Sequence, residues 1–153
     1  MNVKIVQFSE TKVAVYEHTG APKTEEISLN KLISWRLENK LSTKKHQNYG
    51  VHYNDPTSVP LEKYRVDLCI SYEHTVATNP YGIINKTIPA GRCAVVRSIG
   101  ARKNISAAHY LYKVWLPKSG ETLRSFPMFF HYVNVGPDIS EADMITDVYL
   151  PLL

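Results

Sequence analysis

Histidines are the side chains of this sequence that most readily support acid–base or metal chemistry. They are His18, His46, His52, His74, His109 and His131. Their spacings include no His-x-x-x-His pair or similar zinc-ligand pattern, so the sequence indicates no metal site. No serine or cysteine nucleophile is patterned beside His52. We therefore expect His52 to contact a ligand or to complete a strand, and we assign no catalytic residue.

Motifs that bind cofactors are missing as well. The chain has no glycine-rich phosphate loop and no G-x-S-x-G elbow, so we expect no cofactor.

Cys69 and Cys93 each lie in an apolar, strand-like run. We expect two buried, reduced thiols, with a disulfide as the alternative, and a cytoplasmic location.

The composition is that of an ordinary globular protein, with 44% apolar and 21% charged residues. No apolar run is long enough to cross a membrane, and residues 1–8 lack the apolar stretch of a secretory signal. The net charge of +4 comes from scattered basic residues, densest around Lys44 and Lys45, without a nucleic-acid-binding motif. We therefore expect neither membrane insertion nor direct nucleic-acid binding.

The chain aligns with itself at an offset of 80 residues. Trp35 meets Trp115 at this offset, and these are the only two tryptophans. Gly20 likewise meets Gly100. The offset predicts two related halves, at about 1–75 and 81–153, within a single domain.

Each half is expected to form a strand, a helix and two further strands. The strand-like runs lie at 13–16, 49–53 and 65–71 in the first half and at 93–100, 128–133 and 145–150 in the second. The segment 80–89 joins the halves and could begin a fifth strand.

Apolar residues at helical spacing predict one helix in each half. These positions are Leu29, Leu32, Ile33 and Leu37 in the first helix and Ile105, Leu111, Val114 and Trp115 in the second. Thr24 or Ser28 would cap the first helix, and Pro117 and Gly120 would end the second.

The pattern predicts an α+β fold: two β-α-β-β repeats related by a pseudo-twofold axis, with antiparallel sheets and a central cleft. One helix covers only part of its sheet, so two halves packed together would bury the rest and leave a cleft along their seam. Asp67 and Asp147 are equivalent under the offset. This symmetry favours a structural role for both, such as a bond to a turn.

Five segments, in order along the chain, resemble one family. They are 13–20 (VAVYEHTG), 32–35 (LISW), 50–56 with 60–67 (GVHYNDP and PLEKYRVD), 88–95 (IPAGRCAV) and 114–120 (VWLPKSG). Together they resemble the GyrI-like small-molecule-binding domains. That family includes a stand-alone gyrase-inhibitory protein and the effector-binding domains of multidrug-responsive transcription regulators. The resemblance implies a single GyrI-like ligand-binding domain over 1–153.

The resemblance also implies an unusual ligand site. Family members typically carry an acidic residue deep in the cleft, where it pairs with cationic, often aromatic, ligands. Counted from the matching Tyr132 and Asn134, that position falls on Phe130. This chain has therefore lost the charge there. Glu17 or Glu73 could compensate, although nothing in the sequence places either one in the cleft.

Strand alternation then suggests which residues line the cleft. If position 130 points inward, so do 128 and 132, and the offset puts 48, 50 and 52 on the equivalent face. The helices could add both tryptophans and Tyr112. The candidate ligand-binding residues are Trp35, His52, Tyr112, Trp115, Met128, Phe130 and Tyr132. The tryptophans, Met128 and Phe130 could instead be core residues.

Three functions compete on this basis. The first is a stand-alone binding protein for hydrophobic or weakly cationic aromatic small molecules, because aromatic side chains favour flat rings and cations. The alternatives are an inhibitor of DNA gyrase that acts through a protein partner, and a hydrolase of a reactive xenobiotic. An acid paired with a tyrosine or histidine in the site would favour the hydrolase. We expect no DNA-binding module within the 153 residues, so any transcription regulator would be a separate partner.

Overall fold

The structure is a computed structural model that describes residues 1–153, apart from the side chain of Asn104. The chain divides into two compact units. Unit 1 comprises Met1–Glu10 and Pro89–Leu153, and unit 2 comprises Thr11–Ile88. These units differ from the predicted halves because the first ten residues belong with the second half of the chain.

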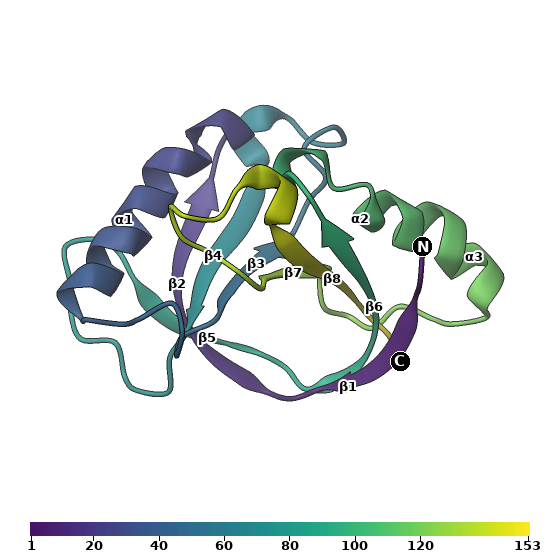
Figure 1. Cartoon of the computed structure of the whole chain (residues 1–153), viewed down its shortest axis with the longest axis horizontal. Coiled ribbons are helices and arrows are strands. Elements are labelled where there is room, and N and C mark those ends of the chain that lie inside the picture. Colours follow the sequence, from purple (N-terminus) through teal and green to yellow (C-terminus); the bar gives the residue numbers. More distant parts are fainter. The chain divides into compact units, whose positions relative to one another are not determined.

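Unit 2 is an antiparallel sheet with one helix. Its strands are β2 (Thr11–Thr19), β3 (Asn48–His52), β4 (Arg65–Ser71) and β5 (Ile84–Ile88), in the order β3-β4-β2-β5. The helix α1 (Glu25–Glu38) lies between β2 and β3 in the sequence and packs beside β2 and β4 (Figure 1). Short 3₁₀ turns span Pro22–Thr24 and Leu61–Lys63.

The helix α1 buries a different face from the one predicted. Its buried residues are Ser28, Leu32 and Trp35, whereas Leu29 and Leu37 are exposed. Apolar residues occur nearly all round this helix, so their spacing alone does not select one face. The bulk of Trp35 and the adjoining sheet decide the orientation instead.

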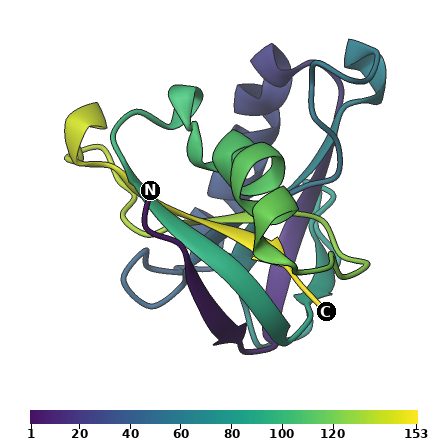
Figure 2. The ribbon, with the colours of Figure 1, turned by 90° about the vertical axis from the view of Figure 1, so that its right-hand side faces the viewer.

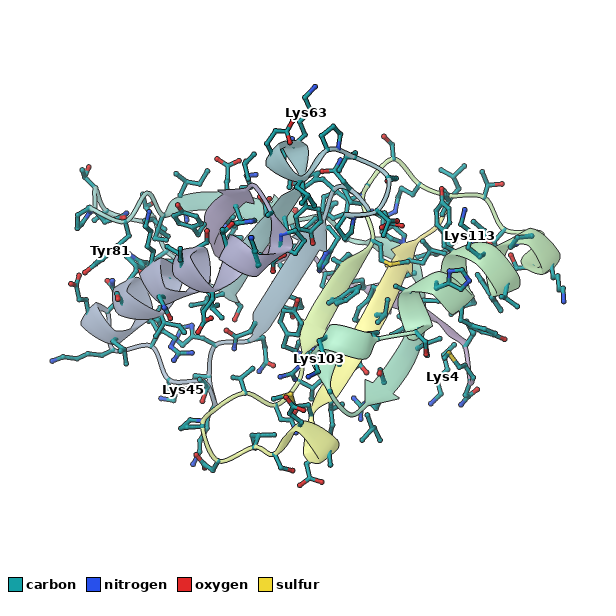
Figure 3. The ribbon with its side chains drawn as sticks, turned by 90° about the horizontal axis from the view of Figure 1, so that it is seen from above. Lys4, Lys45, Lys63, Tyr81, Lys103 and Lys113 are labelled. Carbon is teal, nitrogen blue, oxygen red and sulfur yellow. The ribbon has the colours of Figure 1, made fainter. Side chains whose placement is uncertain are left out.

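Two contacts fix the ends of α1. Thr24 stands at the N-cap position without a side-chain cap, and its hydroxyl donates to the Ala21 carbonyl at 2.8 Å. At the other end, the hydroxyl of Tyr81 donates to a carboxylate oxygen of Glu38 (Figure 3). The segment before β5 is thereby tied to the helix.

Unit 1 is also an antiparallel sheet with a helical segment. Its strands are β1 (Lys4–Phe8), β6 (Gly91–Ile99), β7 (Phe129–Tyr132) and β8 (Ile145–Pro151), in the order β1-β6-β8-β7. The helical segment consists of α2 (Ala107–His109), a π-helix (Tyr110–Trp115) and α3 (Leu116–Ser119). Figure 2 shows it in front of β6 and β8, and short 3₁₀ turns span Arg102–Asn104 and Glu141–Asp143.

The helical segment of unit 1 ends at Gly120, as predicted. Gly120 has a left-handed φ of 77°, which a glycine adopts without strain and which is typical just beyond a helix. The prediction that Pro117 also ends the helix is wrong. Pro117 directly follows the first residue of α3, and the helical segment continues through it from the π-helix to Ser119.

The α+β class is confirmed, and each unit contains one strand more than the three predicted for its half. The strand β5 falls within the predicted joining segment 80–89, whereas β1 was not predicted. The pseudo-twofold axis and the central cleft stay predictions. Among the described residues, no helix is long and apolar enough to cross a membrane.

Candidate ligand-binding site

One face of the unit 2 sheet lies under α1. His52, Gly50 and Asn48 stand opposite Val66, Leu68 and Ile70 in the register. Directly opposed residues in an antiparallel pair share a face. The three β4 residues belong to the core that contains Leu32 and Trp35 of α1. The predicted face, with His52, is therefore the one that α1 covers.

Trp35 is a core residue of unit 2. Its side chain is only 3% exposed, and its ring packs edge-on against Tyr72 with centroids 5.2 Å apart. This is the packing role that the sequence left open as an alternative. Little of Trp35 remains for a ligand in this arrangement.

Three candidate residues of unit 1 pack against the same core, and Tyr132 lies beside one of them. Met128, Phe130 and Trp115 are partly buried and pack against the core that contains Leu111. Phe130 pairs with Val148 of that core, and Tyr132 follows with its ring centroid 6.4 Å from that of Phe130. We use the name aromatic row for the three aromatic residues Trp115, Phe130 and Tyr132 together with Met128.

Tyr112 does not belong to the aromatic row. It lies on the π-helix, is 46% exposed and has the Lys113 ammonium 5.3 Å from its ring. The π-helix is a rare conformation that often marks functional sites. Here it includes Trp115 but leaves Tyr112 largely exposed.

Arg102 is a neighbour of the aromatic row that sequence reasoning missed. Its guanidinium carbon lies 5.2 Å from the centre of the Tyr132 ring. Partial burial lowers the pKa of Arg102, but a guanidinium stays protonated in proteins. No sequence motif marks Arg102, which stands in a short 3₁₀ turn and reaches β8 from there. The row therefore has a positive charge at the Tyr132 end.

A chain of polar side chains lies in unit 2. The Tyr64 hydroxyl is 3.4 Å from Nδ1 of His52 and also hydrogen-bonds the Glu25 carboxylate. Burial lowers the pKa of His52 to about 4, so this ring is neutral at pH 7. Burial also raises the pKa of Glu25, against smaller opposing effects of Tyr64 and His18. Glu25 lies on the same side of α1 as the buried residues Ser28 and Leu32. The sequence prediction placed the buried side of this helix elsewhere and therefore missed Glu25.

Ser28 pairs with His18 instead of capping α1. His18 donates from Nε2 to the Gly20 carbonyl at 3.1 Å, and its Nδ1 then accepts from the Ser28 hydroxyl at 2.7 Å. Both residues are buried. The pair ties α1 to the end of β2 and satisfies polar atoms that burial would otherwise penalise.

The two acids that the sequence offered as substitutes, Glu17 and Glu73, differ in their surroundings. Glu17 pairs with Lys86 at 2.8 Å and stands beside Asp67, on the sheet face opposite to His18 and His52. Glu73 is exposed after the end of β4. Both acids belong to unit 2, whereas Phe130 belongs to unit 1.

The two aspartates that are equivalent under the offset both bind side chains, in line with the structural role that the sequence predicts. Asp67 is buried and accepts from Lys86 Nζ at 2.8 Å and from the Tyr53 hydroxyl at 2.6 Å. Asp147 accepts both Nε and Nη2 of Arg97 at 2.8 and 3.0 Å. Each aspartate is an ion-pair partner within its own sheet, which is a structural role.

Metal chemistry and thiol pairing find no support among the described side chains. In that part of the chain, no group of three or more histidine, cysteine or acidic residues could hold a metal ion. Cys69 and Cys93 are both buried and free. Burial raises the pKa of each thiol, which makes both poor nucleophiles.

Comparisons with known proteins give the same family as the sequence segments. The GyrI-like small molecule binding domain matches residues 1–153. The probable transcriptional regulator YgiV of Escherichia coli K12 is 36% identical over 99% of this chain and 96% of its own. A DNA gyrase inhibitor of Erwinia billingiae is 28% identical over 99% of this chain and 97% of its own.

The solved structures agree at the level of the fold. The C-terminal domain of EcmrR superimposes with a TM-score of 0.76 at 16% identity, over 99% of this chain and 97% of that domain. In a complex of EcmrR with DNA, this chain spans 57% of the EcmrR chain, with a TM-score of 0.77. With the whole-length family match and the identity to YgiV, these findings show that the chain belongs to the GyrI-like small-molecule-binding domain family.

Proposed function

We propose that this chain acts as a stand-alone binding protein for hydrophobic or weakly cationic aromatic small molecules. The observation that carries the proposal is the aromatic row of unit 1, with Phe130 at the position where the family resemblance places an acid. The row is only partly buried, so its rings keep surface that a flat ligand could cover. The position of the ligand between the two halves stays a prediction.

The charges around the row support a preference against strong cations. Phe130 offers a cation only the attraction of its ring quadrupole, about 0.5–2 kcal/mol. Arg102, at the Tyr132 end, repels a cation in addition. A neutral aromatic compound avoids that repulsion and still gains from burial of its rings.

Titration of one cationic dye and a neutral analogue of similar shape tests the proposal. A thermal-shift screen of planar aromatic compounds would first supply the pair, because bound ligand raises stability by mass action. We expect the cationic dye to bind no more than about tenfold tighter than its analogue, a difference of about 1.4 kcal/mol. A larger preference for the cation would contradict the proposed selectivity, and a screen without any binder would contradict the function.

A second candidate function, hydrolysis of a reactive xenobiotic, is favoured by one observation in unit 2. The half-buried Glu25 carboxylate is hydrogen-bonded to Tyr64, which in turn contacts His52. A carboxyl group whose pKa is raised by burial is suited to act as a general acid or base. Mass spectrometry of each bound compound after incubation would reveal turnover. Loss of turnover in Glu25→Gln, with binding retained, would assign the reaction to this residue.

A protein partner is a further alternative. One relative is named as a DNA gyrase inhibitor, which makes gyrase a candidate partner for this chain. Ile27 and Leu37 of α1 are 63% and 66% exposed and could contribute to such a contact. A gyrase supercoiling assay with the purified protein tests this alternative.

A cytoplasmic location is part of the proposal, and the two free cysteines support it.

A further inference from the structure

Arg102 is a partly buried cation whose hydrogen bonds go to neutral acceptors. Among the described residues, no carboxylate lies within ion-pair distance of it. Lys86, a partly buried cation of unit 2, has carboxylate partners in both Glu17 and Asp67. Partial burial of a charge without a counter-charge costs free energy, and such groups are often found at functional sites.

The guanidinium of Arg102 is held rigidly. Nε donates to the Thr146 hydroxyl at 2.9 Å, and Nη2 donates to the carbonyls of Asn134 and Ile145, each at 2.8 Å. Thr146 is 1% exposed, so the anchor itself is buried. Within the part of the chain that the structure describes, these bonds leave the two N–H groups of Nη1 without an acceptor. One side of the fork is thus fixed and the other can still donate.

Arg102 is also placed at one end of the aromatic row. Thr146, which anchors it, stands opposite Tyr132 in the sheet register. The guanidinium carbon lies 5.2 Å from the Tyr132 ring, and the Tyr132 and Phe130 ring centroids are 6.4 Å apart. A flat ligand on the rings of the row would bring a substituent within reach of Arg102.

We propose that Arg102 receives an anionic group of the ligand, so that unit 1 selects aromatic compounds with a carboxylate, sulfonate or phenolate substituent. This inference rests on the binding of aromatic compounds in the proposed function, and it goes beyond that function by adding an anionic substituent to the ligand. The planar guanidinium donates paired hydrogen bonds to such oxyanions, and their charge neutralises its own. Ring stacking on Phe130, whose ring centroid lies 6.4 Å from that of Tyr132, would hold the apolar part of the same molecule.

The test compares 2-naphthoate, an anion, with 2-naphthamide, a neutral compound of the same shape. Isothermal titration at pH 7.5 gives both dissociation constants for the parent and for three variants. In the parent, we expect naphthoate to bind about tenfold tighter than naphthamide, the size of one charge-assisted interaction. Arg102→Gln should abolish this preference while it changes naphthamide binding by less than about twofold.

Lys103→Gln is the matched control. Lys103 is an exposed neighbour in the same 3₁₀ turn, so its removal lowers the net charge by the same amount. The preference for naphthoate should survive this change. Arg102→Lys keeps the charge but lacks the planar fork, and we expect it to lower the preference to about threefold. It replaces Arg102→Gln if the glutamine variant does not fold.

The ratio of the affinities for naphthoate and naphthamide distinguishes a role of Arg102 in ligand recognition from a purely structural role. A purely structural role for Arg102 would weaken both compounds equally and leave the ratio unchanged, which overturns the inference. Equal affinities in the parent, or an equal loss in Lys103→Gln, overturn it as well. If the parent binds neither naphthalene compound but binds other aromatic compounds, only this inference fails. If it binds no aromatic compound, the proposed function fails first.

Discussion

Trp35 packs edge-on against Tyr72, with ring centroids 5.2 Å apart and planes at 87°, inside the core of unit 2. Trp115, its equivalent under the offset of 80 residues, is only partly buried against the core of unit 1. The two residues share a position on the helix of their own unit but differ in exposure. The π-helix that contains Trp115 has no counterpart in α1.

This difference predicts which tryptophan reports on ligand binding. An aromatic ligand on the row should quench the fluorescence of Trp115 and leave that of Trp35 nearly unchanged. Since the chain has no other tryptophan, the variants Trp35→Phe and Trp115→Phe separate the two signals. We expect quenching to persist in Trp35→Phe and to disappear in Trp115→Phe. Quenching that follows Trp35 instead would place the ligand in unit 2.

The neutral ring of His52 predicts a pH dependence of stability. The pKa is about 4 in the folded protein, below the ordinary value of 6.5. Between pH 6.5 and 4 the unfolded chain therefore takes up the proton more readily, and the free energy of unfolding falls as the pH falls through this range. The loss contributed by His52 is on the order of 3 kcal/mol, complete below pH 4.

Urea denaturation at a series of pH values measures this contribution. His52→Gln should flatten the profile between pH 6.5 and 4, because glutamine does not titrate. His74→Gln, which removes an exposed histidine of the same unit, is the control and should leave the slope as it is. An unchanged slope in His52→Gln would show that other groups carry the dependence.

The pair of Lys86 and Asp67 predicts unequal effects of two charge removals. The Asp67 side chain is 4% exposed, whereas Glu17, the other partner of Lys86, is 47% exposed. Lys86→Met leaves a buried carboxylate that keeps the Tyr53 hydroxyl as a donor but loses its cation, and we expect a loss of about 3 kcal/mol in the free energy of unfolding. Glu17→Gln removes an exposed partner and should cost less than about 1 kcal/mol.

The double variant Asp67→Asn/Lys86→Met checks the cause of that loss. Because it removes the buried negative charge together with its partner, it should be more stable than Lys86→Met alone. Denaturant unfolding of the four proteins, with the parent included, measures the difference. If the double variant is the less stable of the two, packing by the lysine stem rather than charge explains the effect.

The sequence predicted the positions of most strands and helices, but it did not predict which face of α1 is buried. Alternation and turn residues located most strands to within two residues, and β4 falls on the predicted run 65–71. The face of α1 could not be read in the same way, because exposed Leu29 and Leu37 are as apolar as buried Leu32. Consequently Glu25, on the buried stripe with Ser28, was missed as a candidate acid.

The aromatic row was predictable because strand residues two apart share a face, and β7 is a regular strand. Arg102 was not predictable, because it reaches that face from a turn 30 residues before Tyr132. Its hydrogen bonds to Asn134, Ile145 and Thr146 depend on tertiary contacts that no local pattern encodes. Local spacing thus finds the rings of the row but not the charge beside them.

The position of Phe130 leads to the last prediction, which concerns selectivity. Phe130→Glu should restore some preference for cationic compounds, because a carboxylate in a partly buried site attracts a cation more strongly than a ring does. Arg102 stands at the Tyr132 end of the row and would partly neutralise the new carboxylate. We therefore expect a modest gain in the affinity for a cationic dye, about fivefold relative to its neutral analogue. Phe130→Glu/Arg102→Gln should gain more affinity for the cationic dye than either single change.

Ile99→Glu is the control, because it adds the same charge to unit 1 at a residue that is 70% exposed. Fluorescence titration should detect no change in the ratio of the two affinities in this variant. A gain in Phe130→Glu that does not grow when Arg102 is removed would mean that the guanidinium does not act on this end of the row.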